Sequence, residues 1–255
     1  AVSALYYADR LNQLPIGVIG IAVGTVLLPE MANRIAVGDE SGARRAQDRA
    51  ITFTLLLSIP CAAAFAIVPD LIMSTLFLRG AFTVTDAAAA GATLAAYSIG
   101  LLPFVLLRAV SSSFLARGDT ATPVKALTIS VVINVGLKIL LMERYAQVGL
   151  AFATSIGVWV NFGLLVWFAM RRKLISFDGW LRSCVIKLIV AGLVLAAVLF
   201  VAAGPVMRSC EALGALQFAV ALAILAILSV LVYGGAVTVL CGPTLLRSFF
   251  RGRGS

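Results

Sequence analysis

Seven apolar segments separated by short polar loops account for most of the chain. Their approximate spans are 5–29, 50–78, 87–113, 126–142, 149–170, 183–203 and 215–240. Most are long enough to cross a bilayer as a helix, which takes about 20 apolar residues. The pattern predicts an all-α fold, a polytopic membrane bundle of about seven transmembrane helices. Pro69-Asp70 interrupts the second segment, so its last part is expected to lie along the membrane interface.

Composition supports a membrane protein. Of the 255 residues, 62% are hydrophobic and only 12% are charged, with a mean hydropathy of +1.07. A soluble domain is about half apolar and about a quarter charged. The net charge of +9 does not point to nucleic acid, because the Lys and Arg residues lie in short loops, where they orient helices and meet anionic headgroups.

Basic residues are concentrated in alternate loops. One set comprises the loops around 34–49, 117–125 and 171–187 together with the tail that holds Arg247, Arg251 and Arg253; the other set holds only Arg79, Arg144 and Arg208. The positive-inside rule places the first set, and with it the C-terminus, in the cytoplasm. The first segment then runs from outside to inside. Within the first set, 38–49 is expected to be a solvated turn with a helix start.

Enzymatic chemistry has no support in the residues. The chain has no histidine, its four cysteines show no CxxC spacing, and no paired carboxylates share a helical face. Neither a catalytic site nor a metal or cofactor site can be assembled from these residues. The chain also opens inside an apolar segment, without a basic leader or cleavage site, and is expected to be a fragment of a longer protein.

Asp9 and Arg10 are the only charges in residues 1–29. A charge at the centre of a membrane helix costs at least about 2.5–3.5 kcal/mol, so it usually faces a bundle interior or a wet cavity. Asp9 could simply neutralise Arg10. We favour a functional role for Arg10 in a cavity, because sequence neighbours do not face each other on a helix.

Arg10 begins a stripe on one face of the predicted helix. The stripe follows spacings of three, four and seven and continues with Gln13, Gly17, Gly20 and Gly24. Glycines at such spacing let a second helix approach closely, and Pro15 is expected to kink the helix below Arg10. The opposite side carries Ile16, Ile19, Val23 and Val26, which suit lipid contact or packing.

Three further polar residues in apolar segments are candidates for the same cavity. Arg108 is either a second cavity cation or a side chain that reaches the cytoplasmic surface. Asn134 and Lys138 are four residues apart and share a face, so both could line the cavity, although Lys138 could also extend to the outer surface. The substrate-binding candidates are therefore Asp9, Arg10, Gln13, Arg108, Asn134 and Lys138.

Three stretches resemble a known family. They are YYADRLNQLPIGVIGIAVGTVLLPEMA (6–32), LFLRGAFTVTDA (76–87) and YSIGLLPFVLLRAVSSSFLARGDTATPVK (97–125). They are similar to the MurJ/MviN lipid II flippases of the multidrug/oligosaccharidyl-lipid/polysaccharide (MOP) exporter superfamily. The resemblance covers residues 1–170 well and the remainder by hydropathy.

The resemblance implies the C-terminal lobe of a MATE-like two-lobe transporter, from about transmembrane helix eight onward. Residues 1–175 would form the second transport lobe. Residues 176–255 would add two helices, a candidate groove for the lipid tail and a basic cytoplasmic tail. In the family the arginine of the ADR motif, here Arg10, is a cavity residue needed for function.

The implied activity is the transfer of lipid II from the inner to the outer leaflet of the bacterial plasma membrane by alternating access. Guanidinium groups would hold the pyrophosphate through charge-assisted hydrogen bonds. The implied partners are lipid II, membrane lipids and the missing N-terminal lobe. Alternatives are an exporter of another lipid-linked oligosaccharide, a cation-coupled drug exporter, or a non-transporting membrane scaffold.

Overall fold

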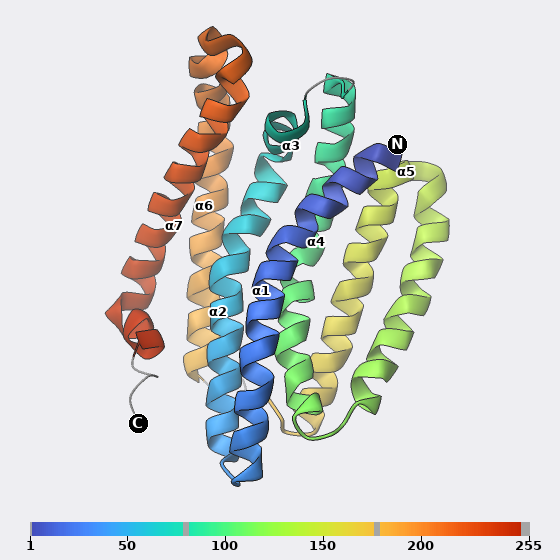
Figure 1. The fold of residues 1–255 in the computed structure, drawn as a ribbon, viewed down its shortest axis with the longest axis vertical. Helices are drawn as coiled ribbons and strands as arrows, with labels where there is room; N and C mark the ends of the chain where they lie inside the picture. Colours follow the sequence, from blue (N-terminus) through green and yellow to red (C-terminus); the bar gives the residue numbers. More distant parts are fainter. Residues whose placement is uncertain (1, 79–81, 176–178, 251–255) are drawn as a thin grey trace.

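The computed structural model describes residues 2–78, 82–175 and 179–250, and regular structure in these residues is entirely helical (Figure 1). Arg79, Arg251 and Arg253, which contribute to the topology prediction, lie outside the described residues. The helices are α1 (Val2–Ala36), α2 (Glu40–Ile67), α3 (Pro69–Phe77), α4 (Val84–Leu115), α5 (Ala121–Arg171), α6 (Gly179–Cys210), the short 3-10 helix η1 (Glu211–Leu216) and α7 (Gln217–Phe250).

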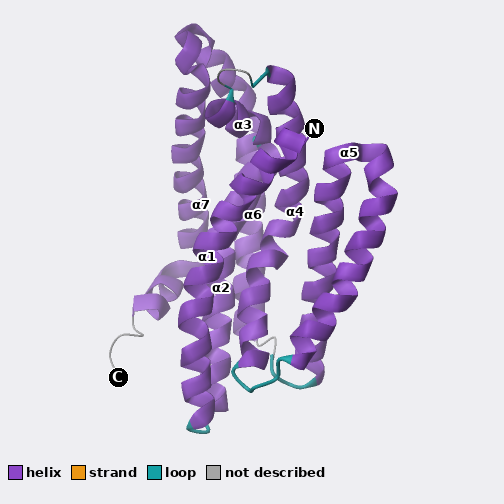
Figure 2. Cartoon of the chain, turned by 45° about the vertical axis from the view of Figure 1, so that its right-hand side comes forward, coloured by secondary structure: helices purple, strands orange, loops and turns teal. Residues whose placement is uncertain are grey.

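The predicted number of membrane spans is confirmed. Seven helical stretches in the described residues are long and apolar enough to cross a membrane. Two of them, Ala121–Met142 and Arg144–Arg171, are arms of α5. The arms fold back on each other at Ala146, whose backbone has φ 45° and ψ −126° (Figure 2). α5 is therefore a helical hairpin rather than one long rod.

α4 is the central helix of the bundle. It packs against α1, α2, α3 and α5, and 67% of its membrane-length window is buried, compared with 11% for the first arm of α5. The α5 hairpin lies on one side of α4, and the α6–α7 pair lies on the other side, against α2 and α3 (Figures 1 and 2). One face of the α5 hairpin and one face of α1 are left uncovered.

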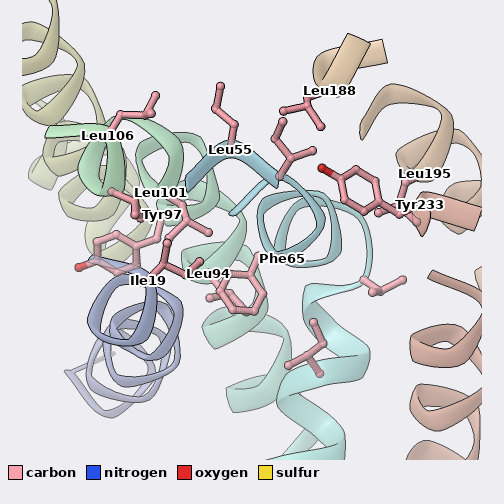
Figure 3. Packing of buried hydrophobic residues seen from close by; sticks show 14 of the residues in the cluster. Ile19, Leu55, Phe65, Leu94, Tyr97, Leu101, Leu106, Leu188, Leu195 and Tyr233 are labelled. Atoms are coloured by element: carbon pink, nitrogen blue, oxygen red, sulfur yellow. The ribbon is translucent and has the colours of Figure 1, made fainter. Parts of the chain in front are cut away.

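Periodic apolar positions build the core between these helices. On α1 the buried face includes Ala8, Ile19, Val23 and Leu27, which repeat at helical spacing. The sequence left open whether Ile19 and Val23 contact lipid or other helices, and in the structure both pack against neighbouring helices in the core. Figure 3 shows Ile19 beside Leu94, Tyr97 and Leu101 of α4, with Leu188 and Leu195 of α6 and Tyr233 of α7 extending the cluster beyond α2.

The turn between α1 and α2 is tighter and more buried than the solvated loop expected over 38–49. The chain reverses at Gly38, which has φ 79°, and α2 begins at Glu40. Asp39 caps the new helix by accepting a hydrogen bond from the Gly42 backbone N–H at 2.8 Å. Gly42 and Gln47 are both buried. Small residues alternate with the charges here, so one face of this amphipathic stretch packs inside the protein.

The interruption predicted at Pro69-Asp70 is confirmed. α2 ends at Ile67, and α3 begins with Pro69 at its first position, where the missing N–H leaves no hydrogen bond unmade. The Thr75 hydroxyl donates to the Phe218 carbonyl at 3.1 Å, which ties α3 to α7. The orientation of α3 along the membrane interface stays a prediction.

Candidate functional site

Two adjoining cavities lie between α1, α4 and α5. The smaller, here called the Asn12 cavity, has a volume of about 190 Å³. The larger, called the Arg108 cavity, has a volume of about 620 Å³. Phe104 lines both, so they are neighbours along one groove. α1 and α4 run in the same direction, which places the first half of α1 at the Asn12 cavity and its second half at the Arg108 cavity.

The Arg108 cavity is a cationic pocket with a few neutral polar side chains on its wall. Arg108 of α4 lies against α1 at Gly20, where a Cβ atom would sit 3.6 Å from the Arg108 Cγ. Among the described residues no carboxylate forms an ion pair with Arg108. Ser111 and Ser112 line the same cavity, as does Asn161, whose buried Oδ1 has no hydrogen-bond partner. The arrangement can accept an anion, because guanidinium hydrogen bonds to phosphate or carboxylate are strong away from water.

The Asn12 cavity is lined by polar groups from three helices. Asp9, Asn12 and Gln13 come from α1, Tyr97 from α4, and Thr154 and Ser155 from the second arm of α5. The Gln13 Nε2 donates to the Asp9 carboxylate at 2.5 Å. Asn12 is only 7% exposed, and its Oδ1 has no hydrogen-bond partner. Asp9 and Gln13, both sequence candidates, therefore meet in one site.

Arg10 faces away from both cavities. It is exposed on α1, with its guanidinium carbon 5.0 Å from the centroid of the Tyr6 ring. In the part of the chain that the structure describes, it forms no ion pair with Asp9, whose carboxylate is held by Gln13 instead. Asp9 is thus not the neutralising partner of Arg10. An exposed arginine within a membrane span requires a polar environment next to that face of α1.

Asn134 and Lys138 lie on the first arm of α5 and line neither cavity. Asn134 packs against the second arm at Gly157, where a Cβ atom would sit 2.8 Å from the Asn134 Nδ2. A packing role within the hairpin accounts for that contact. Gly17 and Gly24 have open space beside them, unlike Gly20. The predicted packing role of Gly17 and Gly24 therefore needs a neighbour beyond the described residues. Pro15 lies inside the continuous helix α1, and the kink expected there stays a prediction.

Sequence reasoning missed several lining residues: Asn12, Tyr97, Thr154 and Ser155. One signal for Asn12 was available, because it lies three residues after Asp9 and one before Gln13 in a polar run on an apolar helix. The remaining three are common residues in membrane helices, and no local pattern separates them from packing positions. Asn161, which lines the Arg108 cavity, was also not among the sequence candidates.

Comparison with solved structures defines the class of fold. The chain superposes over 93% of its length on a lipid II flippase MurJ in an inward closed conformation, with a TM-score of 0.74 and 24% identity, covering 46% of that chain. It also matches an inward-facing multidrug resistance MATE family transporter of the MOP superfamily, with a TM-score of 0.50 and 16% identity over 98% of this chain and 58% of that one. The chain thus has a multi-pass helical membrane fold of the MATE-like type.

Comparison of sequences identifies the family. The model of the family "Lipid II flippase MurJ" matches residues 1–212. The probable lipid II flippase MurJ of Rhizobium meliloti (strain 1021) is 42% identical over 206 residues, which are 79% of this chain and 38% of that protein. Its counterpart in Rhizobium tropici is 38% identical over 199 residues, or 78% of this chain and 37% of that protein. The chain belongs to the lipid II flippase MurJ family, and it spans well under half the length of these relatives.

Proposed function

We propose that the chain forms one lobe of a transporter that moves lipid II from the inner to the outer leaflet of the bacterial plasma membrane, for peptidoglycan synthesis. Family membership supports this activity. The observation that carries it is the Arg108 cavity, which has a cation without an ionic partner among the described residues and opens on the groove between α1 and α5. An unpaired charge within a membrane span costs free energy, so its presence indicates a functional contact.

The anionic pyrophosphate of the substrate would contact the two arginines at different stages of transport. Arg108 supplies a guanidinium inside the groove, beside Gly20 of α1. Arg10 supplies a second one on the exposed face of α1, ten residues before Gly20 and so about 15 Å away along the helix. A guanidinium can bind a phosphate through two parallel hydrogen bonds, and the low dielectric of the site strengthens the attraction. Lys138, which lies outside both cavities on the first arm of α5, would line a cavity shared with a second lobe.

The lipid tail would lie against the C-terminal helices. α6 and α7 are almost free of internal charge, and residues such as Phe200 (75% exposed) and Val239 (83% exposed) present an uncovered apolar surface. This division assigns headgroup binding to residues 1–175 and tail binding to residues 176–255. A prenyl chain needs only such a surface, because its burial is driven by apolar area rather than by polar contacts.

A second lobe would complete the transport path. The uncovered faces of α1 and of the first arm of α5 are the surfaces on which a cavity shared with the N-terminal part of a full-length protein would form. Rocking of the two lobes would expose the headgroup first inside and then outside. The basic loops around 34–49, 117–125 and 171–187 would face the cytoplasm, and so would the C-terminus.

Genetic complementation tests the role of Arg10. A full-length protein that includes this chain and carries Arg10→Ala should fail to support growth when it is the cell's sole lipid II flippase. Arg171→Ala is a matched control, because Arg171 also lies over an aromatic ring, that of Trp167 at 4.4 Å, but stands at the last residue of α5, at the end of a membrane span rather than inside it. Normal growth with Arg10→Ala, at wild-type protein levels, would contradict the proposal.

A further inference from the structure

The polar atoms of the Asn12 cavity include both hydrogen-bond acceptors and donors. The Ser155 hydroxyl donates to the Ala96 carbonyl at 2.8 Å, and the Thr154 hydroxyl donates to the Leu150 carbonyl at 2.9 Å. Both hydroxyl oxygens are left as acceptors. One N–H of the Gln13 amide is used by Asp9, which leaves the Gln13 carbonyl oxygen as an acceptor and the second N–H as a donor.

Asn12 shows that this hydrogen-bonding capacity is unmet within the described residues. The side chain is more than nine-tenths buried and lines the cavity; its Oδ1 is enclosed without a hydrogen-bond partner, and its Nδ2 donates no hydrogen bond to any described residue. A buried polar group without a partner costs about 1–3 kcal/mol, so a native protein usually supplies one. The cavity therefore fits a ligand group that brings both hydrogen-bond acceptors and donors.

Charge and shape narrow the class of ligand. The Asp9 carboxylate disfavours an anion in this cavity, whereas the neighbouring Arg108 cavity attracts one. An uncharged group with both donors and acceptors suits the remaining polar atoms. Tyr97 and Phe104 supply aromatic surface on the α4 side, and Figure 3 shows the Tyr97 hydroxyl directed away from the Leu94 and Leu101 side chains. A sugar ring combines hydroxyl and amide donors with apolar faces, and a cavity of about 190 Å³ holds one ring at most.

We propose that the Asn12 cavity binds a sugar ring of the substrate headgroup while the Arg108 cavity binds the adjoining phosphate. Asn12 and Gly20 are eight residues apart on α1, about 12 Å along the helix, so one extended headgroup spans both cavities. The inference rests on the proposed function and deepens it. It makes Asn12 and Tyr97 residues that distinguish a glycosylated lipid from a bare lipid phosphate.

Binding of two lipids to the purified full-length protein tests this assignment. The probes are lipid II and undecaprenyl pyrophosphate, which lacks the sugars. Asn12→Leu, which removes the amide at similar volume, should weaken lipid II binding about tenfold, the value of one hydrogen bond of about 1.4 kcal/mol, and leave undecaprenyl pyrophosphate binding unchanged. Tyr97→Phe provides a second, more conservative variant with the same expected selectivity.

Thr54→Val is the matched control, because the Thr54 Oγ1 on α2 is also buried without a partner but lies outside both cavities. It should leave the binding of both lipids unchanged. Unchanged lipid II binding in Asn12→Leu and Tyr97→Phe, or an equal loss for both lipids, would overturn the sugar assignment. So would a dependence of wild-type lipid II binding on sodium that Asn12→Leu abolishes, since the cavity would then be a cation site. Failure of the wild-type protein to bind either lipid would contradict the proposed function itself.

Discussion

Single residues decide how closely the helices of this bundle approach one another. At Gly100 of α4, an added Cβ would lie 2.7 Å from the Ser155 Oγ and 2.9 Å from the Ser155 Cα of α5. The second of these atoms is backbone and cannot move without shifting the helix. This contact is also where Ser155 donates to the Ala96 carbonyl, so Gly100 fixes the distance across one wall of the Asn12 cavity.

Replacement of Gly100 by alanine should therefore destabilise the protein. Overpacking of a close contact costs about 1–3 kcal/mol, which outweighs the gain in helix propensity from removing a glycine. The measurement is the melting temperature of the purified protein in detergent, which should fall by several degrees. Gly163→Ala on α5, where nothing lies within 4 Å of the added carbon, should leave it unchanged or slightly raised. Equal melting temperatures for the two variants would contradict the packing argument.

The residues of the site were only partly predictable. Asp9 and Gln13 of α1 were candidates because charges and amides are rare in membrane spans, but helical spacing grouped Gln13 with Arg10, whereas the structure pairs it with Asp9. Asn12 was not selected, since its importance depends on Tyr97 of α4 and on Ser155 of α5, far along the sequence. A pattern within one helix identifies a face, whereas a cavity is defined by which other helices pack against that face.

At the scale of the elements, charged loops join helix ends on the side predicted to be cytoplasmic. Asp119 accepts hydrogen bonds from the Thr122 hydroxyl at 2.7 Å and the Thr122 backbone N–H at 3.0 Å, and it pairs with Arg172 at the other end of the α5 hairpin. These contacts, the Thr122 hydroxyl first, hold the pKa of Asp119 below its ordinary value. The Gly42 N–H, the Ser41 hydroxyl and Arg34 similarly lower the pKa of Asp39.

Low pH should reduce the stability that these loops give to the folded protein. Both carboxyl groups have a lower pKa in the folded protein than in the unfolded chain, so they stabilise the fold at a pH above the unfolded-state pKa of about 3.9. This stabilisation is lost as the pH falls through the folded-state pKa. The melting temperature in detergent should then drop below about pH 4, and the drop should be smaller in an Asp39→Asn, Asp119→Asn double variant. Asp70→Asn is the contrast, since burial raises the pKa of Asp70 and its removal should not reduce the drop. A drop of equal size in the double variant would contradict the account.

The elements themselves were largely predictable, because a membrane imposes length and hydropathy on every span. The sequence indicated all seven spans and the break before Pro69. The helix over 40–49 was underestimated, because its charges mask a buried face formed by small residues and by Gln47. Gln47 reaches α4, where it accepts a hydrogen bond from the Ser113 hydroxyl at 2.6 Å. Such contacts between distant helices leave no hydropathy signal.

At the scale of the whole molecule, the groove between α1, α4 and α5 relates the fold to transport. Its two cavities differ in chemistry, one cationic and one with both hydrogen-bond donors and acceptors, and α6 and α7 add an apolar surface on the far side of α2. The molecule thus offers separate regions for an anionic, a neutral polar and an apolar part of one amphiphile. The chain covers 38% of its relative from Rhizobium meliloti, and the uncovered faces of α1 and α5 are the expected contacts for the remainder.

The most direct test of the central claim is a transport measurement in vesicles that contain a full-length protein including this chain. Lipid II with a labelled headgroup is placed in one leaflet, and its appearance in the opposite leaflet is followed with a membrane-impermeant reagent. The account predicts protein-dependent transfer of lipid II, which Arg10→Ala abolishes and Arg171→Ala preserves. Transfer of a cationic drug, or of another lipid-linked oligosaccharide, without transfer of lipid II would contradict it.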